Sequence, residues 1–331
     1  MTVKRAVAAG AVLLGLCGLY AIEAPYAGFG GEVFVDIPKG AGTAAISRLL
    51  ADAGVVRYGW EFLLVRAIHP RAKLMAGEYL FRKPATPEEV FRRIMRGDVF
   101  FYTLTVPEGS NMFDIAAELE RQDIMPAQDF LKAAHDTAPL RDLDPRAPSL
   151  EGYLFPDTYR VTRHTTARQL CLQMVARFRA AWRELGAAEA EAHDVVTLAS
   201  LVEKEAKLPA ERPVIASVFR NRLRIGMALQ CDPTTIYAAL LDDRYRGAIY
   251  RSDLDSKQLY NTYQHTGLPP GPIANPGMAA LEAALHPADT KYLYFVRRAD
   301  DSGAHQFSEG LAEHARAVQK YRKFGDRLRN H

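Results

Sequence analysis

The hydrophobic positions in the first part of the chain show a strand-like pattern followed by a helical one, and this order occurs twice. Residues 32–37 read as an extended strand, a Pro-Lys-Gly turn follows, and apolar residues within 44–50 then recur at helical spacing. The same order returns later, with a strand-like stretch at 101–106, a Pro-Glu-Gly turn and a helical stripe at 112–119. The pattern predicts two strand–turn–helix units, which suit either a polymer bound in a groove or a packing unit without a ligand.

Periodicity also predicts further helices and strands along the chain. The helices are expected at 60–68, 87–95, 167–185, 193–207, 213–226 and 311–328, and the strands at 77–81, 292–296 and 305–308. Thr86 is the expected cap of the helix at 87–95, with Pro87 at its first position. Residues 138–149 contain three prolines and are expected to form an irregular connector at a domain boundary.

The N-terminal segment is the most asymmetric part of the chain. Lys4 and Arg5 precede an uncharged apolar run at 6–22, which is at the short end of what spans a bilayer. Because no good small-x-small cleavage site follows, the run predicts an uncleaved membrane anchor in preference to a secretory signal. The basic residues place 1–5 on the cytoplasmic side, with a linker at 23–31 and the rest of the chain outside the cytoplasmic membrane.

Composition narrows the possible functions further. The chain has 331 residues, and 42 Lys and Arg against 39 Asp and Glu argue against a dedicated nucleic-acid-binding protein. Three cysteines exclude a disulfide-built scaffold and a cysteine-rich zinc site, and Cys171 and Cys231 are expected to be free thiols. The histidines lack ligand spacing, so no metal site is predicted, and serine-hydrolase, Walker and dinucleotide-binding motifs are missing from the sequence.

The helix expected at 193–207 carries two glutamates beside its apolar face. The apolar side chains centre near Ala199 and Val202, and Glu203 and Glu205 fall on opposite margins of that face. A carboxyl group at such a margin is partly desolvated, which raises its pKa and suits it to act as a general acid near neutral pH. Either glutamate could instead be a boundary residue that reaches solvent, and periodicity alone does not choose between them.

Hydrogen-bonding side chains gather in the segments that follow this helix. They are Asn221, Arg222, Gln230, Asp232, Thr234, Tyr237, Asn261 and Tyr263. A cleft lined by amides, phenols and one carboxyl of raised pKa is typical of a carbohydrate site. Asn221 and Arg222 could instead tie the following loop, and Asp232 could cap the next helix.

Six motifs, in order, resemble those of the endolytic murein transglycosylases of the YceG-like (MltG) type. They are EGYLFPDTY at 151–159, ASLVEKE at 199–205, VFRNRL at 218–223, LQCDPT at 229–234, YNTY at 260–263 and GLPPGPI at 267–273. The resemblance covers nearly the whole chain, including the predicted anchor and the terminal hairpin. It departs from the family pattern at Ala206 and Cys231, where Thr is common, and the second departure puts a polar contact beside Asp232 in doubt.

The resemblance implies a reaction and assigns residues to it. The substrate would be the peptidoglycan glycan strand, cut between N-acetylmuramic acid and N-acetylglucosamine without a cofactor, to leave 1,6-anhydromuramoyl ends. Glu205 matches the family's catalytic glutamate, and Glu203 would then have a structural role with Arg212 or Arg222 as its ion partner. The substrate-binding residues are expected to be Glu151, Tyr153, Asp157, Tyr159, Asn221, Arg222, Gln230, Asp232, Thr234, Tyr237, Asn261 and Tyr263.

The expected fold is α+β. It comprises a transmembrane helix at 6–22, a LysM-like module at 32–137, the connector at 138–149 and a catalytic domain at 150–331. The chain would be a single-pass protein of the cytoplasmic (inner) membrane, with its N-terminus inside and its catalytic domain in the periplasm or on the extracellular side. The family's association with wall synthesis implies cell-wall synthases as partners, which no residue here shows.

Two non-catalytic classes remain as alternatives. A peptidoglycan-binding module would explain the LysM-like units and the aromatic loops, but not a glutamate on an apolar helix face. A scaffold for cell-wall synthases would explain the anchor and the basic C-terminal helix, but not the dense polar motifs.

Overall fold

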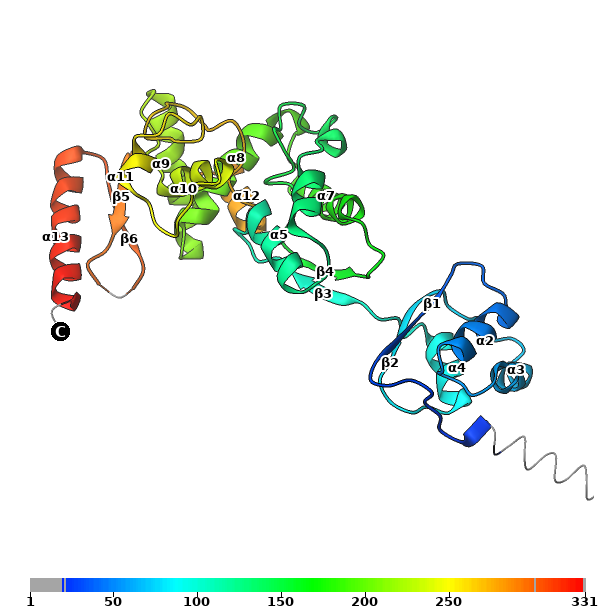
Figure 1. Cartoon of the computed structure of the whole chain (residues 1–331). Coiled ribbons are helices and arrows are strands. Elements are labelled where there is room, and N and C mark those ends of the chain that lie inside the picture. The colour runs from blue at the N-terminus through cyan, green and yellow to red at the C-terminus, as the bar shows by residue number, and fades with distance from the viewer. Residues whose placement is uncertain (1–19, 21, 301, 330–331) are drawn as a thin grey trace, which may run out of the picture. The chain divides into compact units, whose positions relative to one another are not determined.

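The computed structural model describes residue 20 and residues 22–300 and 302–329. The chain divides between Tyr102 and Thr103 into two compact units, which we call the first and the second unit (Figure 1). The strands of the described residues form three two-stranded sheets, and helices make up most of both units. The expected α+β class is therefore confirmed.

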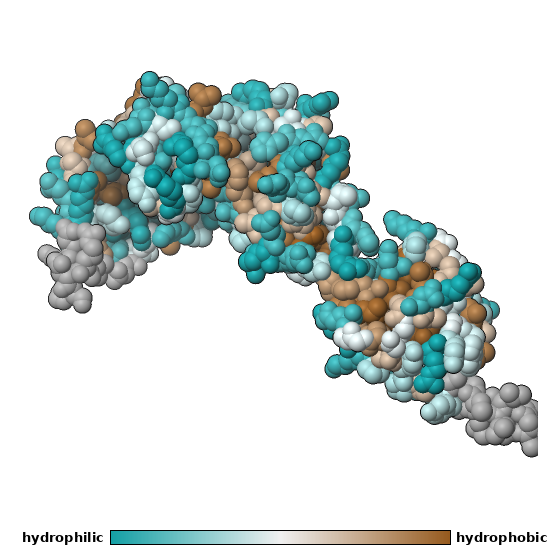
Figure 2. All heavy atoms as spheres, viewed as in Figure 1, coloured by the Kyte–Doolittle hydropathy of each residue, from teal (hydrophilic) through white to brown (hydrophobic). Residues whose placement is uncertain are grey.

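The named elements among the described residues of the first unit are a two-stranded sheet and three helices. They are β1 (Val33–Ile37), α2 (Thr43–Asp52), α3 (Gly59–Ile68), β2 (Gly77–Phe81) and α4 (Pro87–Arg96). The two strands are antiparallel, and their register pairs Val33 with Phe81 and Ile37 with Gly77. Their inward side chains join those of the helices in one apolar core, although hydrophobic residues also reach the surface of this unit (Figure 2).

Local signals determine where α4 begins and ends. Thr86 Oγ1 accepts a hydrogen bond from Glu89 N, and the Glu89 carboxylate accepts one from Thr86 N, which completes a capping box. Pro87 occupies the first turn, and Gly97 ends the helix in the left-handed conformation, with φ 71°. The helix predicted at 87–95 and its cap are confirmed.

The second unit is built around α8. Its elements are β3 (Tyr102–Thr105, which begins at the division), α5 (Met112–Arg121), α6 (Ala127–Ala134), η1 (Ala138–Leu140), β4 (Thr158–Val161), α7 (Ala167–Glu184), η2 (Glu189–Glu191), α8 (Ala192–Glu205), η3 (Pro209–Glu211), α9 (Arg212–Arg224), α10 (Asp232–Leu241), α11 (Arg251–Leu254), α12 (Met278–Leu285), β5 (Tyr294–Arg297), β6 (His305–Ser308) and α13 (Leu311–Arg329). α8 packs against α9, α10 and α12, and these helices share one apolar core with α5, α6 and α7. β5 and β6 form the expected antiparallel hairpin.

The division of the chain comes earlier than the domain boundary expected at 138–149. β3 pairs with β4 rather than with a strand of the first unit, and α6 packs against both α5 and α7. The expected connector is itself folded into the second unit, where Leu140 and Leu143 are buried. The second strand–turn–helix element therefore belongs to the second unit, because its strand and its helix find their partners further along the chain.

The predicted anchor at 6–22 lies outside the described residues, apart from residues 20 and 22. In the part of the chain that the structure describes, no helix is both long enough and apolar enough to cross a membrane. Ile22 is buried in the core of the first unit, and Tyr26 exchanges two backbone hydrogen bonds with Ala85, at 3.0 and 3.2 Å. Part of the expected linker at 23–31 is thus attached to the first unit.

Candidate active site

Glu205 is the last residue of α8, at the point where the chain leaves the helix. The preceding turns are enclosed, with every side chain from Val196 to Val202 buried, whereas Ala206 is already extended, with φ −83° and ψ 106°. The side chain of Glu205 is half-buried as a result. Burial disfavours the charged form and raises the pKa of the Glu205 carboxyl, and the negative charge of Asp232 acts in the same direction.

The thiol of Cys231 is the hydrogen-bond partner of Glu205. Its Sγ donates to Glu205 Oε1 over 3.2 Å. Burial raises the pKa of the thiol, as does the neighbouring Glu205 carboxyl, so the sulfur keeps its proton and acts as a donor. The backbone N–H of Cys231 donates to Thr262 Oγ1 at 3.0 Å, which fixes the position of the thiol. Both cysteines that the structure describes, Cys171 and Cys231, are free thiols, as expected.

Two polar side chains, Asp232 and Tyr263, interact electrostatically with this pair, and a third, Gln230, precedes Cys231 in the chain. Tyr263 donates its hydroxyl to Asp232 Oδ1 at 2.6 Å, and burial raises the pKa of the phenol, which therefore stays protonated. Asp232 is exposed and is the first residue of α10 rather than its cap, which is Cys231. Gln230 is also exposed and has a positive φ of 49°. We call Glu205, Gln230, Cys231, Asp232 and Tyr263 the Glu205 cluster.

Glu203 has different partners from Glu205. Its Oε1 accepts a hydrogen bond from Arg212 at 3.0 Å, and its Oε2 accepts one from Gly277 N at 3.0 Å. Its side chain is almost fully buried, and the same guanidinium lies 3.7 Å from Glu108 Oε2. Of the two arginines expected as ion partners, Arg212 has this role, and Glu203 ties the end of α8 to the segment before α12.

Asn221 and Arg222 bind the backbone of later segments. Asn221 donates to two carbonyl oxygens of 290–293 at 2.8 and 3.0 Å, and Arg222 donates to a third at 2.6 Å and to Leu229 O at 2.6 Å. These contacts agree with the alternative in which Asn221 and Arg222 hold a loop in place instead of binding substrate. The positive charge of Arg222 also lowers the pKa of Glu205, so its influence on the cluster is electrostatic.

Glu151 and Tyr237, both expected to contact substrate, lie in the interior. Glu151 Oε2 accepts from Met112 N, at the start of α5, and Oε1 accepts from Asn275 Nδ2, both at 2.9 Å. Tyr237 is hydrogen-bonded to the same carboxyl, and both residues are buried. Burial raises the pKa of Glu151 to about 8. Their positions fit a structural role, in which a buried carboxyl satisfies one of the free N–H groups at a helix start.

The remaining members of the motif at 151–159 are also engaged within the protein. Tyr153 is buried and donates to Asp144 Oδ2 at 2.5 Å, and Tyr159 is buried and donates to a backbone carbonyl at 2.5 Å. Asp157 is exposed, and Arg177 donates to it at 2.7 Å. The aromatic composition of this motif thus contributes to the core rather than to an exposed surface.

Thr234 and Asn261 are buried and organise the backbone beside the Glu205 cluster. Thr234 Oγ1 donates to Cys231 O at 2.6 Å, within the turn that starts α10. Asn261 Nδ2 donates to three carbonyl oxygens of 253–256, at 2.7 to 3.2 Å. Both residues therefore hold the segments that carry Cys231 and Tyr263.

Asn275 is a central residue that the sequence reasoning missed. Its Oδ1 accepts from Gly152 N and Leu154 N, both at 2.9 Å, and its Nδ2 donates to Ser110 O and to Glu151 Oε1. One buried amide thus joins three distant segments of the second unit. Asn275 precedes a proline, and Asn-Pro is a turn signal, but no feature of the neighbouring sequence predicts that this amide is buried.

His305 is a second residue whose position the sequence did not reveal. Its Nδ1 lies 2.7 Å from Glu211 Oε2, and its backbone N–H donates to Glu211 Oε1 at 2.8 Å. These contacts tie the hairpin to the start of α9. When its ring is protonated, His305 also lowers the pKa of Glu205. The sequence placed His305 in a strand and gave no sign of this pairing.

The cluster has the chemistry of a single acid–base group. In its neutral form the Glu205 carboxyl can donate a proton, because burial stabilises that form. Once charged, it is stabilised by the Cys231 S–H and by the positive charge of Arg222. Among the residues that the structure describes, no group of three or more His, Cys, Asp and Glu side chains could hold a metal ion.

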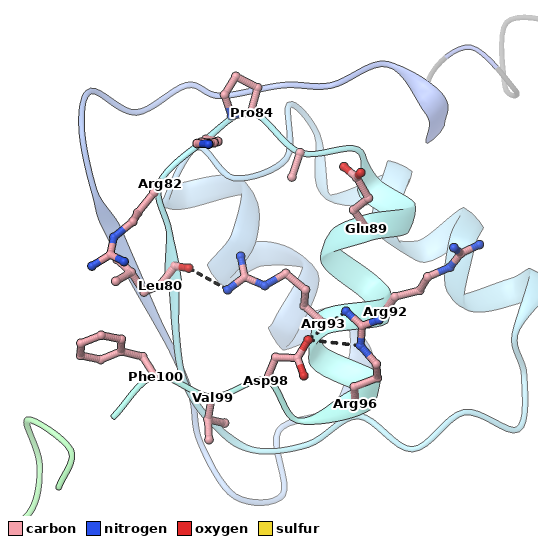
Figure 3. A pocket seen from close by; sticks show the side chains of 12 residues that line it. Leu80, Arg82, Pro84, Glu89, Arg92, Arg93, Arg96, Asp98, Val99 and Phe100 are labelled. Atoms are coloured by element: carbon pink, nitrogen blue, oxygen red, sulfur yellow. Dashed lines mark hydrogen bonds and ion pairs between the residues drawn. The ribbon is translucent and has the colours of Figure 1, made fainter. Parts of the chain in front are cut away.

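The first unit contains a basic hollow of about 590 Å³ (Figure 3). Its cationic lining residues are Arg82, Lys83, Arg92, Arg93 and Arg96. Arg93 donates to Leu80 O at 2.9 Å, and Arg96 is paired with Asp98 at 2.9 Å. Arg82 and Arg92 are paired with Glu32 and Glu88, and Glu89 and Asp98 also line the hollow, so most of its positive charge is compensated within the protein. The hollow lies in a different unit from the half-buried carboxyl of Glu205.

Comparison with known proteins places these features in a family. Residues 35–320 match the model of the YceG-like family. An endolytic murein transglycosylase of Bacillus subtilis (strain 168) is 32% identical over 309 residues, which cover 87% of this chain and 84% of that protein. An endolytic murein transglycosylase of Streptococcus pneumoniae (serotype 2, strain D39) is 28% identical over 328 residues, covering 87% of this chain and 58% of the relative.

A solved structure agrees with this assignment. The crystal structure of a yceG-like protein from Listeria monocytogenes aligns with a TM-score of 0.54 and 32% sequence identity. The alignment covers 86% of this chain and 98% of that chain. The resemblance found in the motifs is confirmed, and the chain belongs to the YceG-like family.

Proposed function

We propose that this chain is an endolytic lytic transglycosylase that cleaves the bond between N-acetylmuramic acid and N-acetylglucosamine in peptidoglycan. The observation that carries the proposal is the environment of Glu205, a half-buried carboxyl whose pKa is raised by burial, which favours the protonated form that a general acid needs. The names of the relatives from Bacillus subtilis and Streptococcus pneumoniae support the same activity.

Glu205 acts first as an acid and then as a base. Its proton passes to the glycosidic oxygen while the bond from that oxygen to the muramoyl anomeric carbon breaks. The resulting carboxylate removes the proton of the muramoyl 6-hydroxyl, whose oxygen bonds to the anomeric carbon. Glu205 is protonated again at the end, no water is consumed, and the product carries a 1,6-anhydro ring. One carboxyl suffices because its two roles follow each other.

The other members of the Glu205 cluster bind the substrate and adjust the pKa of Glu205. The exposed Asp232 and Gln230 offer oxygen and amide groups to sugar hydroxyls, and Tyr263 keeps Asp232 in position through its hydrogen bond. The charge of Asp232 favours the protonated acid at the start of the reaction, and the Cys231 thiol favours the carboxylate that forms during it. The two influences on the pKa of Glu205 thus oppose each other, and each favours the form of the carboxyl that one of the two steps needs.

The location and the additional contacts are part of the same proposal. The apolar run at 6–22, preceded by Lys4 and Arg5, anchors the chain in the cytoplasmic membrane with its N-terminus inside. The second unit then works in the periplasm or outside the cell, and the first unit serves as a LysM-like contact to the glycan strand. Cell-wall synthases are the partners that this location favours.

The products of the purified chain test the reaction directly. Peptidoglycan is digested, the fragments are treated with borohydride, and their masses are measured. The proposal expects fragment ends that are lighter by one water than a reducing end and that resist borohydride. Reducing ends would instead identify a hydrolase, and intact strands that bind the protein would identify a non-catalytic binding module.

A further inference from the structure

One face of α3 exposes a stripe of apolar side chains. α3 buries Phe62 and Val65 in the core of the first unit. The other face presents Trp60, Leu63, Leu64 and Ile68, whose exposed fractions are 48%, 39%, 41% and 61%. A contiguous exposed apolar stripe of this kind is typical of an interaction surface, because exposing apolar side chains to water is unfavourable in free energy.

The stripe begins where the chain enters the first unit. Ile22 is buried in the core, while Tyr20 is 72% exposed. Tyr20, Tyr58 and Trp60 line one hollow of about 240 Å³, and Tyr58 is the residue that precedes α3. The apolar run at 6–22 therefore ends beside the aromatic start of the stripe.

The composition of this surface fits one kind of partner. The rings of Tyr58 and Trp60 are stacked, with centroids 6.3 Å apart and an interplanar angle of 13°. Tyrosine and tryptophan favour the headgroup level of a bilayer, where one end of the side chain is apolar and the other is wet. Arg57 precedes the pair and is exposed, and its guanidinium lies over the ring of Tyr26, 5.1 Å from the centroid, at the same hollow. A cation beside exposed aromatic rings suits the anionic headgroup region of a bilayer.

We propose that α3 docks on the phospholipid bilayer, with Tyr20, Tyr58, Trp60, Leu63, Leu64 and Ile68 in the headgroup region. Such a helix lies in the interface plane with its apolar face about 5–10 Å into the boundary between headgroups and acyl chains. Four apolar side chains bind weakly by themselves, but an anchor that ends beside them gives a high effective concentration of membrane. The docking rests in this respect on the anchor in the proposed function.

Trp60 is a natural probe of this contact. The chain has two tryptophans, and the other, Trp182, is 3% exposed in the core of the second unit. Trp182→Phe should be tolerated, because among the described residues the indole nitrogen of Trp182 has no hydrogen-bond partner. The full chain carrying this substitution is reconstituted into vesicles of phosphatidylcholine and phosphatidylglycerol. Its fluorescence is then quenched either by lipids brominated on their upper acyl carbons or by acrylamide in the water.

A matched probe elsewhere on the first unit provides the control. Met75 is also 48% exposed and lies against Gly97 at the end of α4, the helix on which the buried face of α3 packs. The variant Trp60→Phe, Met75→Trp, Trp182→Phe therefore carries an equally exposed tryptophan away from the stripe. We expect strong lipid quenching and weak acrylamide quenching for Trp60, and the reverse for the control. With Leu64→Glu and Ile68→Glu added, Trp60 should be quenched weakly by the lipids and strongly by acrylamide, as in the control.

The outcomes separate the docking from the anchor. If the chain stays with the vesicles in alkaline carbonate but Trp60 is quenched by acrylamide as readily as the control, docking is refuted and the anchor stands. If Trp60 is protected from both quenchers, a second copy or another protein covers the stripe, and docking on lipid is again refuted. If alkaline carbonate releases the chain, the anchor fails and the docking that depends on it fails too.

Discussion

Glu203 and Glu205 stand two residues apart at the end of α8, yet Glu203 is held by Arg212 and Glu205 by the thiol of Cys231. On a helix, two residues two positions apart point about 200° from each other. Glu203 is held by a guanidinium, whereas burial favours the neutral form of Glu205. This difference separates the structural glutamate from the proposed acid.

Glu203→Gln should lower stability and leave turnover measurable. The amide can still accept from Gly277 N, but it leaves the partly buried Arg212 with only the more distant Glu108 carboxylate, 3.7 Å away, as an ionic partner. Weakening one charged hydrogen bond in this way costs about 1–3 kcal/mol. Thermal unfolding and glycan digestion of the same preparation measure both effects. If Glu203→Gln were well folded but inactive, Glu203 rather than Glu205 would be the general acid.

Cys231→Ala should shift the pH dependence of catalysis. The thiol donates to Glu205 and lowers its pKa, so removing the donor raises the pKa. A general acid loses activity as the pH rises through its pKa, and the basic limb of kcat/KM should therefore move to higher pH. Cys231→Thr restores a hydroxyl donor and should move the limb back. An unchanged limb in both variants would show that the thiol does not act on Glu205.

Glu151→Gln should change how stability depends on pH. The pKa of Glu151 is raised from 4.5 to about 8 by burial, so its contribution to stability is fully present below about pH 4.5. That contribution is lost as the pH rises through about 8, because the unfolded chain ionises first. Urea midpoints measured across this interval should fall with rising pH in the wild type and fall less in the variant.

Asp157→Asn is the matched control for Glu151→Gln. The Thr158 N–H and the Arg177 guanidinium lower the pKa of Asp157 below 3.8, so its contribution is present above that value and lost in more acidic solution. The slope between pH 4.5 and 8 should therefore survive in Asp157→Asn. An equal slope in wild type and Glu151→Gln would mean that Glu151 ionises normally in the folded protein.

Asn275→Ala should be among the most destabilising single substitutions in the second unit. It leaves the buried N–H groups of Gly152 and Leu154 without their acceptor and removes the donor to Glu151. Each buried group left unpaired costs about 1–3 kcal/mol, so the loss should be roughly 2–5 kcal/mol. Chemical denaturation measures it, and a loss as small as that of an exposed polar residue would contradict the central role of this amide.

The secondary structure was predictable where the local pattern is strong. The cap of α4, the long helices and the terminal hairpin follow from periodicity and turn residues, and the resulting bounds differ by a few residues. α12 (Met278–Leu285) was not predicted, because a helix that is apolar nearly all round carries no stripe. The pairing of β3 with β4 was also missed, since it joins strands separated by the whole of 106–157 and leaves no local signal.

The candidate site was predictable in part for a similar reason. The margin position of Glu205 follows from helical geometry, whereas charge limited the ion partner of Glu203 only to Arg212 or Arg222, of which the structure shows Arg212. Glu151, Tyr153 and Asn261 were expected at the surface of a cleft but are buried, because residue type does not reveal burial when polar groups satisfy each other inside. The sequence motifs identify these residues, but they do not distinguish a residue that stabilises the fold from one that contacts the substrate.

The central claim is that Glu205 alone supplies both proton transfers, and glycan digestion by Glu205→Gln tests it most directly. The full chain, Glu205→Gln and the matched Glu203→Gln are incubated with peptidoglycan, and the 1,6-anhydromuramoyl ends are counted by mass spectrometry. Removing a general acid costs about 10²–10⁴-fold in rate. We expect Glu205→Gln to melt like the wild type, bind glycan and yield at least that much less product, while Glu203→Gln stays active. Product formation by Glu205→Gln near the wild-type rate would contradict the claim.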